Sequence, residues 1–347
     1  MKLNFCTLFN ANYLSRGLVM YDSLMQHCKD FNLYVFAFDD ACADYLMAQS
    51  LKNLVVIRLN EFEDEKLLSV KSSRTAAEYC WTSTPSTILY CLTKFDLDHC
   101  TYIDADLLFY ADPIVLVQEM GQKSVLITEH RYSPQHDQSE RSGKYCVQFI
   151  TAKNDFDGLK TMHWWRNACI DWCYARHEDG KFGDQKYLDN WPQMFDGIHE
   201  LQNLGGGVAP WNVQQYEFFN DQTILKGIEL KTKNEFDLIF FHFHGFKYHQ
   251  NNLVALAENG YELSKNVQNL IFKPYAKKLF LKGLEISKTA PEINYHAIFS
   301  EAPYGEMSPS TLFKYYLNGI KSSKKNIIPT QLFQKIKQHY YFNVNKL

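Results

Sequence analysis

The sequence predicts an α/β fold built on a doubly wound, mixed sheet in which most strands are parallel. Short apolar runs alternate with helical patterns through the first hundred residues, and several of these runs close on polar residues. The length of 347 residues, 46% of them hydrophobic, allows one large α/β domain with an appended segment. Ligands bind outside the carboxyl ends of the strands in such sheets, so the polar residues that follow each strand are candidates for function.

The first half of the chain supplies four expected strands and two helical stretches. The strands are expected at residues 3–9, 33–38, 54–59 and 100–103. A helical pattern follows the first strand and puts on one face Leu14, Leu18, Tyr21, Leu24 and Met25. Residues 74–94 are also expected to be helical, with Pro85 breaking the helix or opening a second one.

The second half continues the alternation before its character changes. Strands are expected at 124–128, 145–151 and 237–241, and a long helix at 155–176. Cys169 and Cys173 continue the apolar spacing of that helix, which favours core positions over a role as ligands. We therefore divide the chain into an α/β domain, residues 1–250, and a basic, mainly helical C-terminal extension, residues 251–347.

Composition and charge narrow the functional classes. The net charge of −3 and the lack of a recognisable motif argue against a nucleic-acid partner. No apolar stretch reaches the roughly 18 to 20 residues of a membrane span, and the N-terminus does not resemble a signal peptide. Nine cysteines without CxxC pairs favour reduced thiols. We expect a cytoplasmic protein.

The C-terminal extension differs from the rest of the chain in charge. From residue 265 onward, thirteen lysines and four glutamates give a balance of +9. Aromatic and basic residues alternate over 272–280 and 332–337. These stretches predict peripheral contact with the inner face of the plasma membrane or with a lipid-linked acceptor. Solvated helices packed on the α/β domain are the alternative interpretation.

Asp104-Ala105-Asp106 is the most informative motif. It follows the expected strand 100–103, and residues i and i+2 of extended backbone face the same way. Both carboxylates could therefore reach one hard cation, Mn²⁺ or Mg²⁺, which prefers oxygen ligands and accepts phosphate oxygens in its shell. A solvated turn is the alternative for an isolated triplet of this kind.

His242 ends the apolar run DLIFFH and is the candidate third ligand. Imidazole is a suitable ligand for Mn²⁺, whereas His244 and His249 are weaker candidates. Gly245 would let backbone approach a phosphate, and Lys247 could neutralise its charge. The alternative for His242 is a strand-end histidine satisfied by hydrogen bonds.

Several segments together resemble the GT-A (Rossmann-like) glycosyltransferases, in particular family 8 and the sugar transferases of bacterial polysaccharide clusters. The resemblance extends over roughly residues 4–250. The matching segments are NANYLSRGLVMYDSL, RTAAEYCWTSTPS, TYIDADLLFYADP, WWRNACIDWCYARHEDGKFGDQKYLDNWP, GGGVAPWN and FFHFHGFK.

The resemblance implies roles for the matched residues. Asp104, Asp106 and His242 correspond to the metal ligands, and Asp184 and Gln185 to the catalytic pair beside the transferred sugar. The donor-binding positions that it implies, beside Asp104, are Thr7, Asn10, Asn12, Tyr13, Arg74, Gly245 and Lys247. Tyr13 would stack on the nucleotide base.

The sequence also departs from the family pattern. Asn10 stands where a carboxylate is common, and the segment from His242 to Lys247 is one residue shorter than usual. Trp81 lies where an arginine is frequent, which leaves Arg74 and Lys71 as substitutes. Cys146-Val147-Gln148 replaces an expected Asn-x-Gly near the sugar, so the donor sugar does not follow from the resemblance.

The resemblance implies transfer of a sugar from a nucleotide-diphosphate donor, UDP rather than GDP, to a glycan or lipid-linked acceptor. Surface polysaccharide or lipopolysaccharide biosynthesis, with retention at the anomeric carbon, is the expected setting. A non-catalytic nucleotide-sugar-binding protein, a nucleotidyltransferase on a similar sheet and a two-carboxylate hydrolase are the alternatives. The intact metal triplet argues against the first, and the lack of a Gly-rich basic loop after the first strand argues against the second.

Overall fold

The computed structural model describes residues 1–222, 224–258, 260–301, 303, 310 and 340–347. A seven-stranded sheet forms its centre, with the strand order β3-β2-β1-β4-β7-β6-β8. These strands are β1 (Leu3–Phe9), β2 (Phe31–Ala37), β3 (Leu54–Arg58), β4 (His99–Ile103), β6 (Val125–Glu129), β7 (Tyr145–Lys153) and β8 (Ile198–Glu200). β1 is parallel to β2 and β4, whereas β7 is antiparallel to β4 and β6. The predicted α/β class with a mixed sheet is therefore confirmed.

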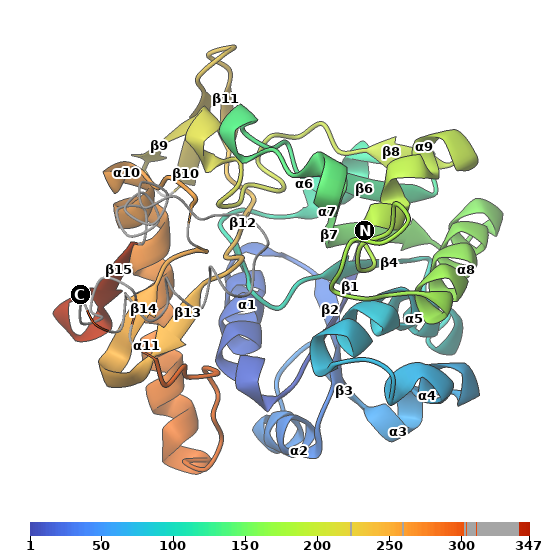
Figure 1. Ribbon diagram of the computed structural model, residues 1–347, viewed down its shortest axis with the longest axis horizontal. Helices are drawn as coiled ribbons and strands as arrows, with labels where there is room; N and C mark the ends of the chain where they lie inside the picture. Colours follow the sequence, from blue (N-terminus) through green and yellow to red (C-terminus); the bar gives the residue numbers. More distant parts are fainter. Residues whose placement is uncertain (223, 259, 302, 304–309, 311–339) are drawn as a thin grey trace.

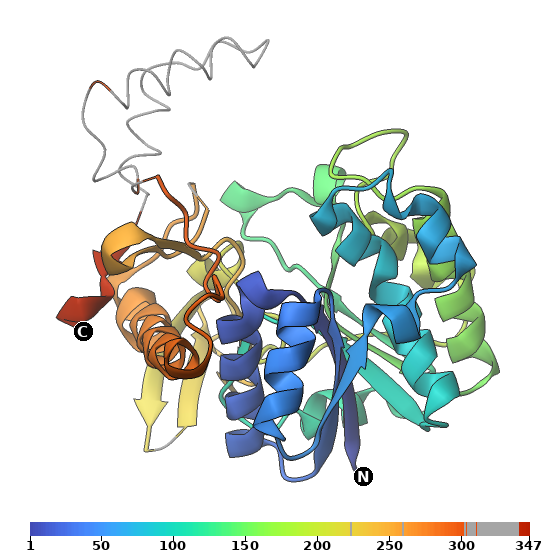
Figure 2. The same ribbon diagram turned by 90° about the horizontal axis from the view of Figure 1, so that it is seen from below.

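Helices cover both faces of this sheet (Figure 1, Figure 2). α1 (Leu14–His27) and α2 (Asp40–Gln49) pack on one face, and α5 (Ala76–Lys94) and α8 (Phe156–Asp171) pack on the other. Each face of the sheet therefore carries its own apolar core. Successive side chains of β1 point to opposite faces, so Phe5 joins the core under α1 and α2, and Cys6 joins the core under α5 and α8. The shorter helices are α3 (Leu59–Phe62), α4 (Glu65–Lys71), α6 (Ile114–Glu119), α7 (Ser139–Ser142) and α9 (Trp191–Met194).

Two helices differ from their predicted extents. α5 runs through Pro85 without a break, after a capping box at its start in which Thr75 and Glu78 satisfy each other's backbone N–H groups. α8 ends at Asp171 rather than near residue 176, and Trp172 is already extended. The Tyr187 hydroxyl donates to the Trp172 carbonyl at 2.8 Å, which supplies one of the partners that a continued helix would have provided.

Two smaller predictions are also corrected. Met25 of α1 is 40% exposed and does not join the buried face, whereas Leu14, Leu18, Tyr21 and Leu24 do. The single strand expected over 237–241 is divided into β11 (Glu235–Asp237) and β12 (Phe240–His242). Both strands pair with other partners, since β11 joins β10 and β12 joins β5.

Three smaller sheets flank the central one. β5 (Leu107–Phe109) pairs with β12. β9 (Tyr216–Asp221) and β10 (Ile224–Glu229) form an antiparallel sheet with β11. β13 (Lys247–His249), β14 (Leu253–Ala255) and β15 (Tyr341–Asn343) form the third, which joins segments from both sides of residue 250. α10 (Lys265–Val267), a π-helical turn (Gln268–Phe272) and α11 (Lys273–Thr289) follow β14.

α11 packs against α1 of the α/β domain. Its buried face includes Leu279 and Ile286, and Lys282 forms an ion pair with Asp22 of α1 at 2.8 Å. The apolar face of this helix is therefore covered by the protein itself. The predicted contact stretch 332–337 lies outside the described residues. Within the described ranges, no helix combines the length and the hydropathy that crossing a bilayer requires.

Candidate metal and donor site

The paired aspartates follow β4 directly. The Asp104 backbone N–H donates to the Gln148 carbonyl of β7 at 3.1 Å, and Leu107 N–H donates to the Asp104 carbonyl at 3.3 Å. The chain then enters β5, whose residue Leu107 lies opposite His242 in β12. This pairing brings His242, distant in sequence, beside Asp106.

The three predicted metal ligands converge. His242 Nε2 lies 3.2 Å from Asp106 Oδ1 and 3.6 Å from Asp104 Oδ2. One ligand atom from each residue falls within 4.8 Å of the others. The opposite ring nitrogen, Nδ1, lies 2.8 Å from Gln148 Oε1, and the Tyr102 hydroxyl donates to Asp104 Oδ1 at 3.0 Å. Asp104 and His242 thus each have a neighbour outside the triplet that orients them.

Burial and mutual charge set the electrostatics of this cluster. Burial, reinforced by the Asp106 charge, raises the pKa of Asp104 to about 6. Burial also opposes ionisation of Asp106, but the charge and hydrogen bond of His242 outweigh it and lower the pKa of Asp106 to about 2. The same carboxylates hold the pKa of the buried His242 well above its ordinary value. The pocket therefore favours positive charge between the carboxylates.

The residues fit a hard divalent cation. Two carboxylates and one imidazole leave about three of six coordination positions for phosphate oxygens and water. The ring of Trp211 packs edge-on against His242 at 5.4 Å between centroids, and its Nε1 donates to the His130 carbonyl at 3.0 Å. Trp211 belongs to the GGGVAPWN segment, so this segment contacts the ring of His242.

Asp184 lies near the same cluster. Only 5% of it is exposed, and burial together with the Asp104 charge raises the pKa of its carboxyl to about 8. It does not cap the following helix, since Gln185 occupies the N-cap position of the 3₁₀ helix Lys186–Asn190. Gln185 Nε2 donates to the Ser142 carbonyl of α7 at 2.6 Å, which fixes that side chain.

The turn after β1 presents Asn12 and Tyr13 to solvent. Tyr13 is 40% exposed, and the charges of Asp106 and Asp104 add to burial in raising its pKa. Asn10 begins this turn, where its carbonyl accepts the Tyr13 N–H at 3.0 Å. Thr7 is fully buried in β1, and its hydroxyl has no partner among the described residues.

Arg16 is a residue of this region that the sequence analysis missed. It is 2% exposed, and its guanidinium lies 4.6 Å from the Tyr13 ring centroid. It donates to the carbonyls of Phe246 and His296, each at 3.1 Å. Arg16 therefore connects the turn after β1 to the segment around Gly245. Arg16 follows Tyr13 by three residues, and this helical spacing could have indicated that the two side chains lie together.

The segment after β12 forms a tight turn at Gly245. Gly245 has a φ of +74°, and a Cβ there would lie 2.5 Å from Glu258 Cγ and 2.9 Å from Glu258 N. Lys247 Nζ lies 5.4 Å from the Phe299 ring centroid. His244 is near enough for its charge to lower the pKa of Asp106, whereas His249 Nδ1 contacts the Glu301 carbonyl at 2.5 Å.

The two proposed substitutes for the family arginine have other partners. The Arg74 guanidinium stacks over Tyr174 at 3.9 Å and donates to the Ile170 carbonyl at 3.1 Å. Lys71 pairs with Glu63 at 2.6 Å. The structure does not bring either of them into contact with the described residues of the metal cluster, so the role of Arg74 in donor binding stays a prediction.

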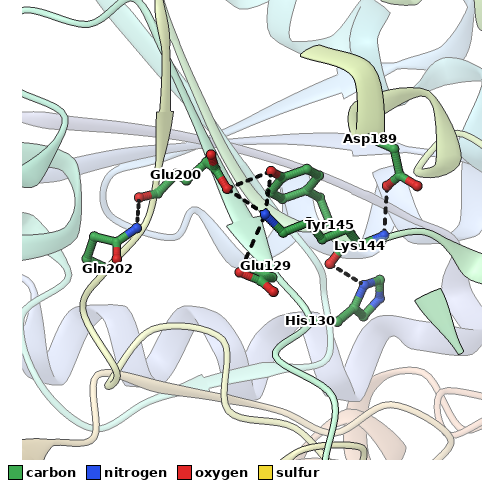
Figure 3. Close-up of polar contacts among 7 residues, drawn as sticks. All are labelled: Glu129, His130, Lys144, Tyr145, Asp189, Glu200 and Gln202. Carbon is green, nitrogen blue, oxygen red and sulfur yellow. Dashed lines mark hydrogen bonds and ion pairs between the residues drawn. The ribbon is translucent and has the colours of Figure 1, made fainter. Parts of the chain in front are cut away.

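A second polar cluster occupies the same edge of the central sheet, where β7 begins (Figure 3). Lys144 Nζ lies 2.9 Å from Glu200 Oε2 and 3.9 Å from Glu129 Oε2. The Tyr145 hydroxyl donates to Glu200 at 2.6 Å, and Lys144 N–H donates to Asp189 Oδ1 at 2.7 Å. These bonds hold the start of β7 against the helix that follows Gln185. The members of this cluster are far apart in the chain, so no sequence pattern indicates it.

Comparison with solved structures finds distant similarity to glycosyltransferases. GlyE of Streptococcus pneumoniae TIGR4 is 16% identical with a TM-score of 0.40, over 59% of this chain and 47% of GlyE, so this chain spans about half of GlyE. Mouse xyloside xylosyltransferase 1 is 11% identical with a TM-score of 0.46, over 70% of this chain and 97% of that chain. The galactosyltransferase LgtC is 14% identical with a TM-score of 0.39, over 60% of this chain and 76% of that chain.

Comparison with known sequences gives closer relatives, although no protein-family model matches the chain. The uncharacterized protein YfnD of Bacillus subtilis strain 168 is 31% identical over 255 residues, which cover 69% of this chain and 82% of YfnD. YfnF of the same strain is 30% identical over 256 residues, covering 71% of this chain and 82% of YfnF. With identity at this level over most of both relatives, the chain belongs to the family of YfnD and YfnF.

Proposed function

We propose that this protein is a metal-dependent glycosyltransferase of the GT-A type that uses a nucleotide-diphosphate sugar, with UDP preferred to GDP. The observation that carries the proposal is the convergence of Asp104, Asp106 and His242 at the carboxyl end of β4. A doubly wound sheet places its ligand crevice at this edge. The acceptor would be a glycan or a lipid-linked sugar in surface polysaccharide biosynthesis.

Each residue of the site has a proposed task. Asp104, Asp106 and His242 Nε2 would hold Mn²⁺ or Mg²⁺, which supplies charge neutralisation at the departing diphosphate. Tyr13 offers an exposed ring for the nucleotide base, and Arg16 supports that ring from the side of the helix. The backbone at Gly245 would approach a phosphate of the donor, and Lys247 would neutralise part of its charge.

Asp184 and Gln185 are the proposed catalytic residues, and we propose retention at the anomeric carbon. The proposal is supported by the burial of Asp184, by the effect of the Asp104 charge on its pKa, and by the contact with Ser142 that orients the neighbouring Gln185. A covalent route would use Asp184 as the nucleophile, whereas a front-face route would need only Gln185 near the developing positive charge. Proton NMR of the first-formed product reads the configuration, and an inverted product would remove both routes.

The test of the proposed function is a donor panel. UDP-sugars and GDP-sugars are added to the full chain with Mn²⁺, and the melting temperature and the release of free nucleotide are both measured. A glycosyltransferase should be stabilised by one donor class. It should release free nucleotide slowly when water is the acceptor of the sugar, and faster when an acceptor glycan is present. Stabilisation without any release would favour the non-catalytic nucleotide-sugar-binding protein. No stabilisation by any donor would contradict both.

A further inference from the structure

Gln148 connects two ligands of the candidate cation site. It lies in β7 next to β4 and is fully buried. Its main-chain carbonyl accepts the Asp104 N–H at 3.1 Å. Its side-chain Oε1 lies 2.8 Å from His242 Nδ1. One residue therefore contacts the aspartate through its main chain and the histidine through its side chain.

The side-chain contact determines which nitrogen of His242 faces the carboxylates. An amide oxygen accepts a hydrogen bond, so Nδ1 must carry a proton when it faces Oε1. In the neutral ring, Nε2 then has the free lone pair, and Nε2 is the nitrogen that lies 3.2 Å from Asp106. The opposite orientation of the amide would place the imidazole proton on Nε2, where it would block a cation.

The surroundings of Gln148 support a specific role for its side chain. Its Nε2 is buried without a hydrogen-bond partner among the described residues, although a buried donor of this kind is normally paired. A Cβ at Gly207 would lie 3.2 Å from that nitrogen and 2.7 Å from Thr128 Cγ2. The glycine therefore leaves the room that the amide occupies.

We propose that Gln148 is the positioning residue of the cation site, which holds His242 in the tautomer that presents Nε2 to a divalent cation. This inference rests on the proposed function, because it assumes that the cluster binds a cation. A partner of the second ring nitrogen orients a histidine ligand and adds to its affinity for metal. A neutral amide does so without adding a third carboxylate to Asp104 and Asp106.

The direct test measures Mn²⁺ binding to the full chain by electron paramagnetic resonance, without nucleotide. Gln148→Met keeps the size of the side chain but removes the acceptor, and we expect binding to weaken by about ten- to a hundredfold. Gln148→Asn is the second variant, in case Gln148→Met does not fold. It keeps an amide that is too short to reach His242, so it should weaken Mn²⁺ binding to a similar extent. Gln148→Glu keeps an acceptor and should bind Mn²⁺ at least as tightly as the wild type.

Thr151→Val is the matched control. Thr151 lies on the same strand and shares a buried 2.8 Å hydrogen bond with Thr101, away from the cation site, so its loss should leave Mn²⁺ binding unchanged. A second measurement is ¹⁵N NMR of the histidines with Mg²⁺, in which the wild type should show a proton on Nδ1 of His242. Gln148→Met should lose that fixed tautomer.

The outcomes separate this inference from the proposed function. Wild-type Mn²⁺ affinity in Gln148→Met would overturn the inference alone. Equal weakening in Gln148→Met, Gln148→Glu and Thr151→Val would also overturn it, because a general disturbance of β7 would then explain the effect. A wild-type protein that binds no Mn²⁺ would overturn the inference together with the metal site on which it rests.

Discussion

The side chains of the candidate cation site depend on neighbours that come from other strands. Tyr102 of β4 donates to Asp104, and Gln148 of β7 contacts both Asp104 and His242. The sequence predicted the two aspartates and the histidine, because their types and positions after apolar runs indicate their chemistry. It did not predict the role of Gln148, because only the antiparallel pairing of β4 with β7 brings that residue to the site.

Asp106→Asn tests the cation ligand with the lowest pKa of the cluster. The substitution retains the size of the side chain but removes a charge, so we expect Mn²⁺ binding and turnover to fall by at least about a hundredfold. His242→Ala should have a milder effect that excess Mn²⁺ partly offsets. Asp171→Asn, at the exposed end of α8, is the matched control. Full activity in Asp106→Asn would contradict the assignment.

Asp184→Asn tests catalysis separately from donor binding. If Asp184 acts on the transferred sugar, turnover should fall by about a hundredfold or more while the Kd for the nucleotide changes by less than about threefold. Donor affinity is measured by calorimetry with Mn²⁺, and turnover by nucleotide release. An equal loss in both quantities would indicate that Asp184 shapes the site rather than acting in the reaction.

The observed strands and helices match the bounds predicted from the sequence where tertiary contacts agree with local preference. β1, β2 and β3 lie within two residues of their predicted bounds. α5 and α8 differ from their predicted extents for different reasons. α5 continues through Pro85, which is buried within the helix, whereas α8 ends where the Tyr187 hydroxyl donates to the Trp172 carbonyl. Tyr187 belongs to a later element, so the periodicity of α8 contains no information about this contact.

The start of α1 is connected to residues near 296, and this contact predicts a pH effect. His296 is 4% exposed, its Nδ1 lies 2.7 Å from Ser15 Oγ, and burial beside Arg16 lowers its pKa from 6.5 to about 3. Between these two values the unfolded chain binds more protons at this residue than the folded chain. Stability should therefore be complete above about pH 6.5 and should fall as the pH decreases towards 3.

His296→Gln tests this effect, because it removes the titrating group. Each pH unit below 6.5 costs at most about 1.4 kcal/mol, so the wild type should lose up to about 2 kcal/mol at this residue by pH 5. Urea unfolding at pH 7.5 and pH 5 gives the free energies of unfolding. The variant should lose less stability than the wild type between these two values. An identical loss would show that His296 does not titrate as its burial implies.

The molecule as a whole combines an acidic α/β part with a basic C-terminal part, whose helix α11 packs against α1. α11 buries its apolar face on α1, which leaves Lys277, Lys278, Leu281 and Leu284 exposed on the other side. Among the described residues, this exposed face of α11 is the candidate for the predicted membrane contact. The division of the chain at residue 250 stays a prediction, since β13 and β14 pair across it.

A charge-reversal pair tests the membrane contact. The full chain is expected to co-sediment with anionic liposomes at low salt, and Lys277→Glu with Lys278→Glu should weaken binding by about 1 kcal/mol or more per lysine. Lys231→Glu with Lys233→Glu makes the same change in net charge on exposed residues between β10 and β11. Wild-type protein that stays in the supernatant would contradict the contact, as would equal losses in both pairs.

The interdependence of cation and donor tests the central claim most directly. A cation held by Asp104, Asp106 and His242 that also contacts the diphosphate must couple the two bindings. Calorimetric titration of UDP-glucose, or of the donor that the panel selects, is performed with Mn²⁺ and again with EDTA. We predict that the Kd rises at least about tenfold in EDTA, which is 1.4 kcal/mol of coupling. The same donor affinity with Mn²⁺ and with EDTA would contradict the assignment of the site and the proposed function with it.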